Sequence, residues 1–343
     1  MVMRCTGSMT EARAEERPFA ATHAVAMASV ALMWGSSFLL IAVGGDHLAP
    51  ALVALLRVAF GAATLALLPG ARRPVARAAW PGIAALGVVW MAAPFVLFAV
   101  AERSIDSALA GMVNASAPLF TAVVAAVWAR ALPRGRQVRG LLVGFAGVVL
   151  VCIPELGSHA SGALGLGMVV LATLLYGIAF NLAGALERAH GALPVIWRAQ
   201  LVALALLLLP GLEGAARSEF AWSSVIAVAV LGVFPTAVAF ALFAGLAGSV
   251  GATRAALATY FLPAVAIALG AVFRDERVAA ASLGGAVLIV LGAYLAARVG
   301  GDQGPRGGSA HQARSRPRIP RPEARARRRP RRWAGVGGAG SGP

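Results

Sequence analysis

The chain alternates between long apolar runs and short polar breaks. Between residues 20 and 298, charged residues and prolines separate ten apolar runs of about 16–26 residues. The runs are 20–44, 49–69, 80–100, 107–129, 138–153, 162–185, 192–209, 222–247, 252–273 and 279–298. A helix of about 20 apolar residues crosses the hydrocarbon core of a bilayer. The pattern therefore predicts an all-α polytopic membrane protein with ten transmembrane helices.

Composition supports this class and argues against a soluble enzyme. The chain is 59% hydrophobic and 13% charged, whereas roughly a quarter of the residues in soluble domains are charged. Its net charge of +16 comes from arginine, because the sequence contains no lysine. A body of this length cannot bury so much apolar surface in one soluble core, so we expect lipid to cover it.

The two ends of the chain differ from its apolar middle. Residues 1–19 mix Arg and Glu and are interpreted as a cytosolic leader. Residues 299–343 are rich in Arg, Pro and Gly and are expected to be disordered. On the cytosolic side this tail could contact anionic lipid. Nucleic acid is the less favoured partner for it, and arginine-biased coding is a third explanation.

Arginine positions predict the orientation, because Arg-rich short loops stay in the cytoplasm. With the N terminus inside, twelve arginines fall on the inner side, the tail not counted: Arg4, Arg13, Arg17, Arg72, Arg73, Arg77, Arg130, Arg134, Arg136, Arg139, Arg188 and Arg254. Only four fall outside: Arg103, Arg217, Arg274 and Arg277. We therefore expect both termini to be cytoplasmic and the protein to reside in the plasma membrane.

The sequence contains an internal repeat. At an offset of 145 residues, aromatic and proline positions of the first half recur in the second, as in Phe95 with Phe240, Phe98 with Phe243 and Pro118 with Pro263. At an offset of 142, Trp34 falls on Tyr176 and Phe38 on Phe180. The predicted repeats cover 20–153 and 162–298 with five runs each. An odd number of spans inverts the second copy, as in many secondary carriers whose site lies between the halves.

Several segments resemble a known family. WGSSFLLIAV at Trp34, followed by LAPALVALLRVAFGA, is similar to the opening of EamA-type members of the drug/metabolite transporter superfamily. Segments 107–130 and 251–278 resemble the end of the EamA repeat. The resemblance implies ten helices in two inverted five-helix repeats and the export or uptake of small metabolites. Glu276 fits the acidic residue that commonly ends the fourth helix of a repeat, whereas Ala131 stands at that position in the first.

Aromatic residues in the middle of the runs are the first candidates for a binding site. Trp34, Trp90 and Tyr176 lie far from the run ends, and lipid offers no partner for their N–H or O–H groups. They are expected to face either a central pocket or ordinary helix packing. The repeat relation between Trp34 and Tyr176 favours the pocket.

Polar residues inside the runs are the second group of candidates. Asn114 and Thr259 are repeat partners, each one turn before a proline that frees a backbone carbonyl. Either they bind polar groups of a substrate or they join neighbouring helices, and Ser37 leaves the same two alternatives open. Arg57 and Arg198 are the charged residues well inside the runs. Each either anchors its helix or binds an anionic substrate group.

Other sequence features limit the alternatives. No Asp or Glu lies in the interior of a run, so proton coupling has no support in the sequence and a facilitator is equally compatible. The histidines are scattered, and neither a metal-ligand cluster nor a nucleotide-binding loop is present, so we expect no cofactor and no enzymatic activity.

The sequence predicts a secondary transporter, favouring export, of small metabolites by alternating access at a midplane site. A lipid-handling membrane enzyme and a scaffold or sensor are the alternatives.

Overall fold

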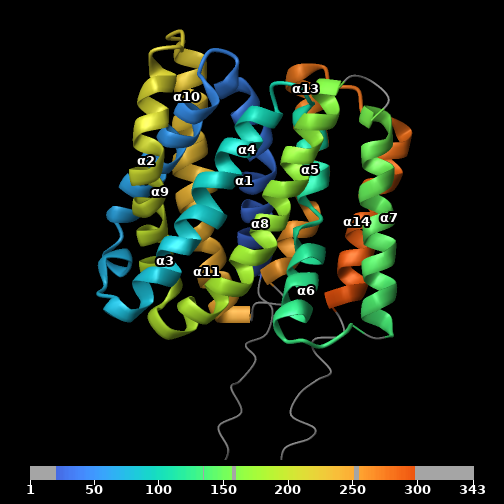
Figure 1. Ribbon diagram of the computed structural model, residues 1–343, viewed down its shortest axis with the longest axis horizontal. Coiled ribbons are helices and arrows are strands. Elements are labelled where there is room, and N and C mark those ends of the chain that lie inside the picture. The colour runs from blue at the N-terminus through green and yellow to red at the C-terminus, as the bar shows by residue number, and fades with distance from the viewer. Residues whose placement is uncertain (1–20, 134, 157–159, 251–254, 298–343) are drawn as a thin grey trace, which may run out of the picture. The chain divides into compact units, whose positions relative to one another are not determined.

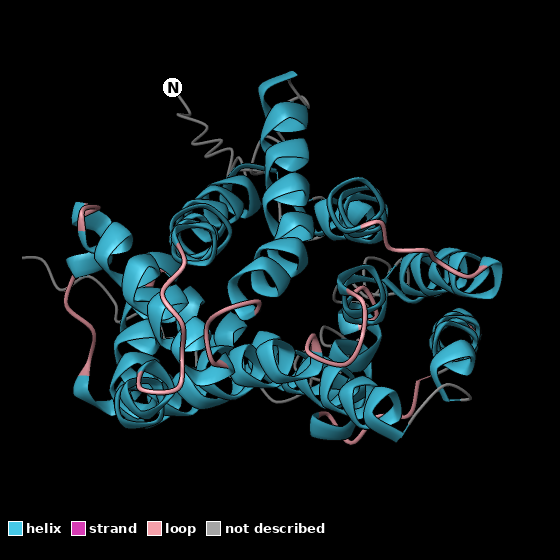
Figure 2. Ribbon diagram, turned by 90° about the horizontal axis from the view of Figure 1, so that it is seen from above, coloured by secondary structure: helices cyan, strands magenta, loops and turns pink. Residues whose placement is uncertain are grey.

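The computed structural model describes residues 21–133, 135–156, 160–250 and 255–297, and every regular element within these ranges is a helix (Figures 1 and 2). The predicted leader and tail, together with Arg134 and Arg254, lie outside the described residues. The protein is thus an all-α polytopic membrane protein, as the apolar runs predict.

The first half of the chain contains the helices up to residue 156. They are α1 (Ala21–Gly45), α2 (Pro50–Ala66), η1 (Pro69–Arg72), η2 (Arg77–Ala79), α3 (Trp80–Leu86), η3 (Gly87–Ala92), α4 (Ala93–Ala101), α5 (Ser107–Asn114), α6 (Ala117–Trp128) and α7 (Arg136–Leu156). Pro50 begins α2, where its fixed φ suits the first turn and its missing N–H costs nothing.

The second half follows the same plan. Its elements are α8 (Ala160–His190), α9 (Ala192–Ala215), α10 (Trp222–Leu231), η4 (Gly232–Val238), α11 (Ala239–Val250), η5 (Ala256–Phe261), α13 (Leu262–Arg274) and α14 (Ala280–Ala297). Gly191 joins α8 to α9 with a positive φ of 85°, which glycine adopts without steric cost.

The observed helices agree with the apolar runs, with shifts at the ends. Among the described residues, eight helical segments are long and apolar enough to cross a membrane, and α2 and α14 are shorter apolar helices. The run 138–153 looked short, but its helix α7 extends over Arg136–Leu156. The count of ten spans stays a prediction.

Local irregularities recur at the repeat offset. A π-helical turn occupies Gly87–Ala92 in the first half and Gly232–Val238 in the second, so both begin at equivalent positions. Likewise α6 begins at Ala117 and α13 at Leu262, again 145 residues apart. A shared proline does not explain the two π-helical turns, because Pro235 lies in the second turn and Trp90 stands at the equivalent position of the first. The backbone therefore carries the duplication more clearly than the sequence does.

Helices α7 and α14 pack against each other along glycines, beside the rest of the bundle (Figure 1). A Cβ placed on Gly147 would lie 2.6 Å from the carbonyl oxygen of Gly285, and one on Gly292 would meet the backbone of Gly144. Glycine is needed here because the two backbones approach too closely for a side chain.

Candidate substrate cavity

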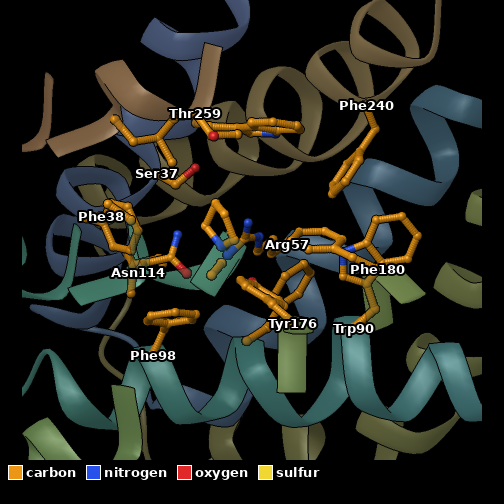
Figure 3. A pocket seen from close by; sticks show the side chains of 17 residues that line it. Ser37, Phe38, Arg57, Trp90, Phe98, Asn114, Tyr176, Phe180, Phe240 and Thr259 are labelled. Atoms are coloured by element: carbon orange, nitrogen blue, oxygen red, sulfur yellow. The ribbon is translucent and has the colours of Figure 1, made fainter. Parts of the chain in front are cut away.

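A cavity of about 100 Å³ lies among α1, α2, η3, α4, α8, α11 and the breaks within the α5–α6 and η5–α13 spans. Seven of the eight candidate residues line it: Trp34, Ser37, Arg57, Trp90, Asn114, Tyr176 and Thr259. Figure 3 shows Arg57 near the centre, with Asn114 on one side and the rings of Trp90 and Phe180 on the other. The residues that looked unusual within their runs thus share one space.

Repeat partners occur together in the lining of this cavity. Its lining includes both members of five pairs that are related by the 142 or 145 offset: Trp34 with Tyr176, Phe38 with Phe180, Phe95 with Phe240, Asn114 with Thr259 and Ala117 with Leu262. The cavity draws on both halves, with most of its lining from the first, and a site between repeats is the arrangement found in many carriers.

Arg57 is the charged residue that lines the cavity. Its side chain is buried, with 6% of the residue exposed, and its Nε donates a hydrogen bond of 2.9 Å to Oγ1 of Thr236. The guanidinium carbon lies 3.6 Å from the centre of the Phe95 ring, within cation–π distance. No carboxylate of the described residues forms an ion pair with it. A buried cation without an anion costs several kcal/mol, so the site is electrostatically suited to an anionic group.

The π-helical turn η4 holds Arg57 in place. Within it, the hydroxyl of Thr236 donates to the carbonyl of Leu231 at 2.9 Å while accepting the bond from Arg57. Gln200 Nε2 donates to the carbonyl of Thr236 at 3.2 Å. Leu231 precedes Pro235 by four residues, so its carbonyl is one that the proline frees. The irregular turn therefore supplies a polar support in the middle of an apolar helix.

Asn114 adds a second unsatisfied polar group. Only 9% of the residue is exposed, and its Oδ1 is buried with no hydrogen-bond partner in the part of the chain that the structure describes. An amide oxygen in this state accepts a hydrogen bond from any donor that enters the cavity. Ser37 and Thr259 differ, because their hydroxyls bond the carbonyls of Met33 and Ala256 within their own helices.

Aromatic rings form most of the remaining wall. Trp90 packs edge-to-face against Phe180 and Phe240, with ring centres 5.9 and 5.2 Å apart. The indole of Trp34 contacts Phe240 and donates its N–H to the carbonyl of Pro235 at 3.2 Å. The wall is thus apolar and suited to an apolar or aromatic body.

Arg198, the eighth candidate, does not line the cavity. Its Nη1 donates to the carbonyls of Ala71 and Pro194, at 3.2 and 3.1 Å. Those carbonyls belong to η1 and to the first turn of α9, so Arg198 joins α9 to η1. This matches the anchoring alternative for Arg198, and we leave it out of the proposed site.

Contacts between the two halves bridge one end of the bundle. Arg274 at the end of α13 forms a two-point ion pair with Asp46, which follows α1, at Nη1–Oδ2 2.9 Å and Nη2–Oδ1 3.2 Å. The carboxylate of Glu276 accepts bonds from the backbone N–H groups of Ser107 and Ala108, at 3.0 and 2.9 Å. We call this the Asp46 end.

Some lining residues were not among the sequence candidates. Phe180 and Phe240 complete the wall, and two residues outside the lining contribute as well, because Thr236 bonds Arg57 and Gln200 bonds the carbonyl of Thr236. The repeat alignment could have found the two phenylalanines, because each pairs with a lining residue of the first half. Thr236 gave no signal, since threonine is common within apolar helices. Within the described residues, no group of three or more His, Cys, Asp or Glu side chains could hold a metal ion.

Comparison with known sequences now identifies the class. The sequence profile described as the EamA-like transporter family matches residues 22–153 and 163–298. The protein is a multi-pass membrane transporter by this criterion. The chain belongs to the EamA-like transporter family.

Curated relatives carry transporter names. The chain is 26% identical to the "Uncharacterized transporter YdfC" of Bacillus subtilis, over 76% of this chain and 86% of that protein. It is 28% identical to the "Probable terminal-alkyne amino-acid exporter" of Streptantibioticus cattleyicolor, over 79% and 91%. It is 26% identical to the "Probable amino-acid metabolite efflux pump" of Escherichia coli, over 78% and 91%. A protein of known crystal structure shares the fold, with a TM-score of 0.56 and 20% identity over 81% of this chain and 97% of that one.

Proposed function

We propose that the protein is a plasma-membrane exporter of small carboxylate-bearing metabolites with an apolar body, working by alternating access. The substrate site is the cavity that contains Arg57. The two repeats, 20–153 and 162–298, are inverted copies that rock around this cavity, and both chain ends are cytoplasmic.

One observation carries the proposal: a buried guanidinium, which forms no ion pair with an acid of the described ranges, faces a cavity with aromatic walls. A carboxylate would offset the cost of burying Arg57, since charge-assisted bonds to arginine are strong and often two-pronged. The free Oδ1 of Asn114 would accept a bond from an amine or hydroxyl of the same molecule. An amino acid or one of its derivatives combines these features, and the names of two relatives support that choice.

Closure at the Asp46 end supports alternating access. The Arg274–Asp46 pair and the Glu276 contacts both join the first repeat to the second. Both side chains of the ion pair are partly exposed, so water can replace their contact when the pair separates. Such contacts can break and re-form during a transport cycle.

Efflux from proteoliposomes tests the proposal. The panel contains aromatic and branched-chain amino acids and their N-acyl derivatives, each paired with the amide made from the same carboxyl group. We expect at least one acid to leave about tenfold faster than its amide, because the amide loses the charge-assisted bonds to Arg57. A tenfold ratio corresponds to about 1.4 kcal/mol. Equal rates for every acid and amide, or no transport in the panel, would contradict it.

A further inference from the structure

Glu102 is a buried acid that the transport site does not use. It directly follows α4 and lies one turn beyond Phe98, which lines the central cavity. The residue is partly exposed as a whole, but both carboxyl oxygens are buried and neither has a hydrogen-bond partner. A buried, unpaired carboxylate is strongly unfavourable, so the group is stable here only in its neutral form.

Two polar pockets meet at Glu102. One of about 260 Å³ is lined by Asp46, Glu102 and Arg274, and the other, of about 290 Å³, by Glu102, Arg274 and Glu276. Ile41 lines both the first polar pocket and the aromatic cavity, so its side chain is a common wall of the two spaces. Glu102 therefore lies next to the contacts that close the Asp46 end and next to the substrate cavity.

The charged and titratable groups around Glu102 come from several elements. They are Asp46 after α1, Arg57 on α2, Arg103 and Asp106 in its own loop, Tyr176 on α8, Arg274 on α13 and Glu276 after α13. Burial raises the pKa of Glu102 well above its usual value, and the negative charge of Glu276 raises it further. The positive charges of Arg57 and Arg274 oppose this shift.

We propose that Glu102 is a proton-binding site that couples protonation to opening of the Asp46 end. The proposal rests on the proposed function, because it assigns a driving ion to transport through that end. In the closed form described here, Glu102 holds its proton. Once ionised, it needs water or a cation. Arg57 bonds Thr236 and faces the substrate cavity, and Arg274, which lines both polar pockets, is engaged by Asp46. Ionisation thus favours separation of Arg274 from Asp46.

The sign of the pH effect follows from linkage. A raised pKa means that the closed form binds the proton more tightly than a form in which Glu102 is hydrated. Raising the pH therefore shifts the population towards the open form, and lowering it favours closure. By reciprocity, opening of the Asp46 end releases the proton.

Infrared spectroscopy of the full-length protein in lipid vesicles measures proton binding without a substrate. We expect a C=O band of a protonated carboxyl group that persists above the pH at which exposed acids ionise. All variants carry Glu187→Gln, which removes another partly buried carboxyl group. In this background the band should be missing from Glu102→Gln and present in Glu219→Gln, a control whose side chain is 89% exposed near the same end. An unchanged band in Glu102→Gln, or no carboxyl group that titrates above the usual range, would overturn the proposal.

Thiol labelling measures opening of the Asp46 end. Ala42→Cys places a cysteine in the lining of both polar pockets, in a background that carries Cys5→Ser and Cys152→Ala. Its labelling rate in detergent is divided by that of Ala216→Cys, which is exposed and reports the pH effect on any thiol. This ratio should rise about fivefold or more between about pH 6 and pH 8 and stay nearly constant with Glu102→Gln. The same rise in Glu102→Gln would overturn the proposal.

These measurements separate the two proposals. Neither uses a substrate, so their failure removes the proton site and leaves the carboxylate exporter intact. Equal efflux of acids and amides, with both proton readouts as expected, would instead remove the proposed substrate.

Discussion

Arg57 on α2 and Thr236 in the π-helical turn η4 are joined by a hydrogen bond of 2.9 Å between Nε and Oγ1. The two residues are 179 positions apart, one in each half of the chain. Through this bond the second half orients the cation that faces the cavity. A rearrangement of η4 would therefore move or release Arg57, which connects helix geometry to substrate binding.

Replacing Thr236 by Val should weaken substrate binding while the protein still inserts and folds. Valine keeps the shape of the side chain but removes the acceptor for Arg57, and one such bond contributes about 1 kcal/mol, or roughly fivefold. Equilibrium binding of a transported acid measures the effect. Thr64→Val is the control, because Thr64 bonds only the carbonyl of Phe60 in its own helix. Equal affinity in both variants would show that Thr236 does not position Arg57.

Replacing Trp34 or Tyr176 by Ala should lower transport about tenfold or more, since each removes an aromatic contact worth about 1–2 kcal/mol to an apolar substrate. Membrane yield should remain close to that of the unaltered protein. Trp222→Ala is the control, as Trp222 is 69% exposed and does not line the cavity. If efflux is unchanged in Trp34→Ala and Tyr176→Ala, these rings serve only to pack the helices.

Gly285→Val should destabilise the fold without touching the cavity. A Cβ there would lie 2.7 Å from the carbonyl oxygen of Gly147, and overpacking of this kind costs about 1–3 kcal/mol. The adjacent Gly284→Val meets only Leu150 at 3.7 Å and introduces the same side chain into the same helix. Thermal unfolding in detergent should give a lower Tm for Gly285→Val than for Gly284→Val. Equal values would mean that α7 and α14 separate easily enough to accept the side chain.

A reporter fused after Pro343 tests the orientation. The predicted excess of arginine on the inner side places both termini in the cytoplasm. A fluorescent reporter that matures only in the cytoplasm should be bright, and an enzyme that is active only outside should be silent. The reverse pair of results would invert the orientation and move the Asp46 end to the cytoplasmic side.

The sequence predicted the class of fold well because a bilayer imposes a simple rule. Each span must be continuously apolar for about 20 residues, so runs such as 20–44 stand out without any knowledge of packing. Irregular backbone is harder to foresee. Pro235 lies in η4, but Trp90 stands at the equivalent position of η3, so a shared proline does not predict the two π-helical turns. Residues 107–129 form one apolar run, and the break between α5 and α6 is not visible in it.

The candidate site was recoverable where a residue conflicts with lipid, as Trp34, Asn114 and Arg57 do. Sequence could not separate Arg57 from Arg198, because both are arginines inside apolar runs. The structure distinguishes their surroundings: Arg198 donates to the carbonyls of Ala71 and Pro194, whereas Arg57 lines a cavity. Glu102 was missed for the opposite reason. It lies beyond the end of the run 80–100, where an acid does not conflict with lipid, and only packing shows that its carboxyl oxygens are buried.

Equilibrium binding to an Arg57→Gln variant tests the central claim most directly. The ligands are a transported acid and its amide, and the matched control is Arg198→Gln, which changes the same residue type outside the cavity. We predict that Arg57→Gln binds the acid at least about tenfold more weakly and no longer prefers it to the amide. Arg198→Gln should keep both the affinity and the preference. If Arg57→Gln retained the preference for the acid, the cavity around Arg57 would not be the site that recognises the substrate.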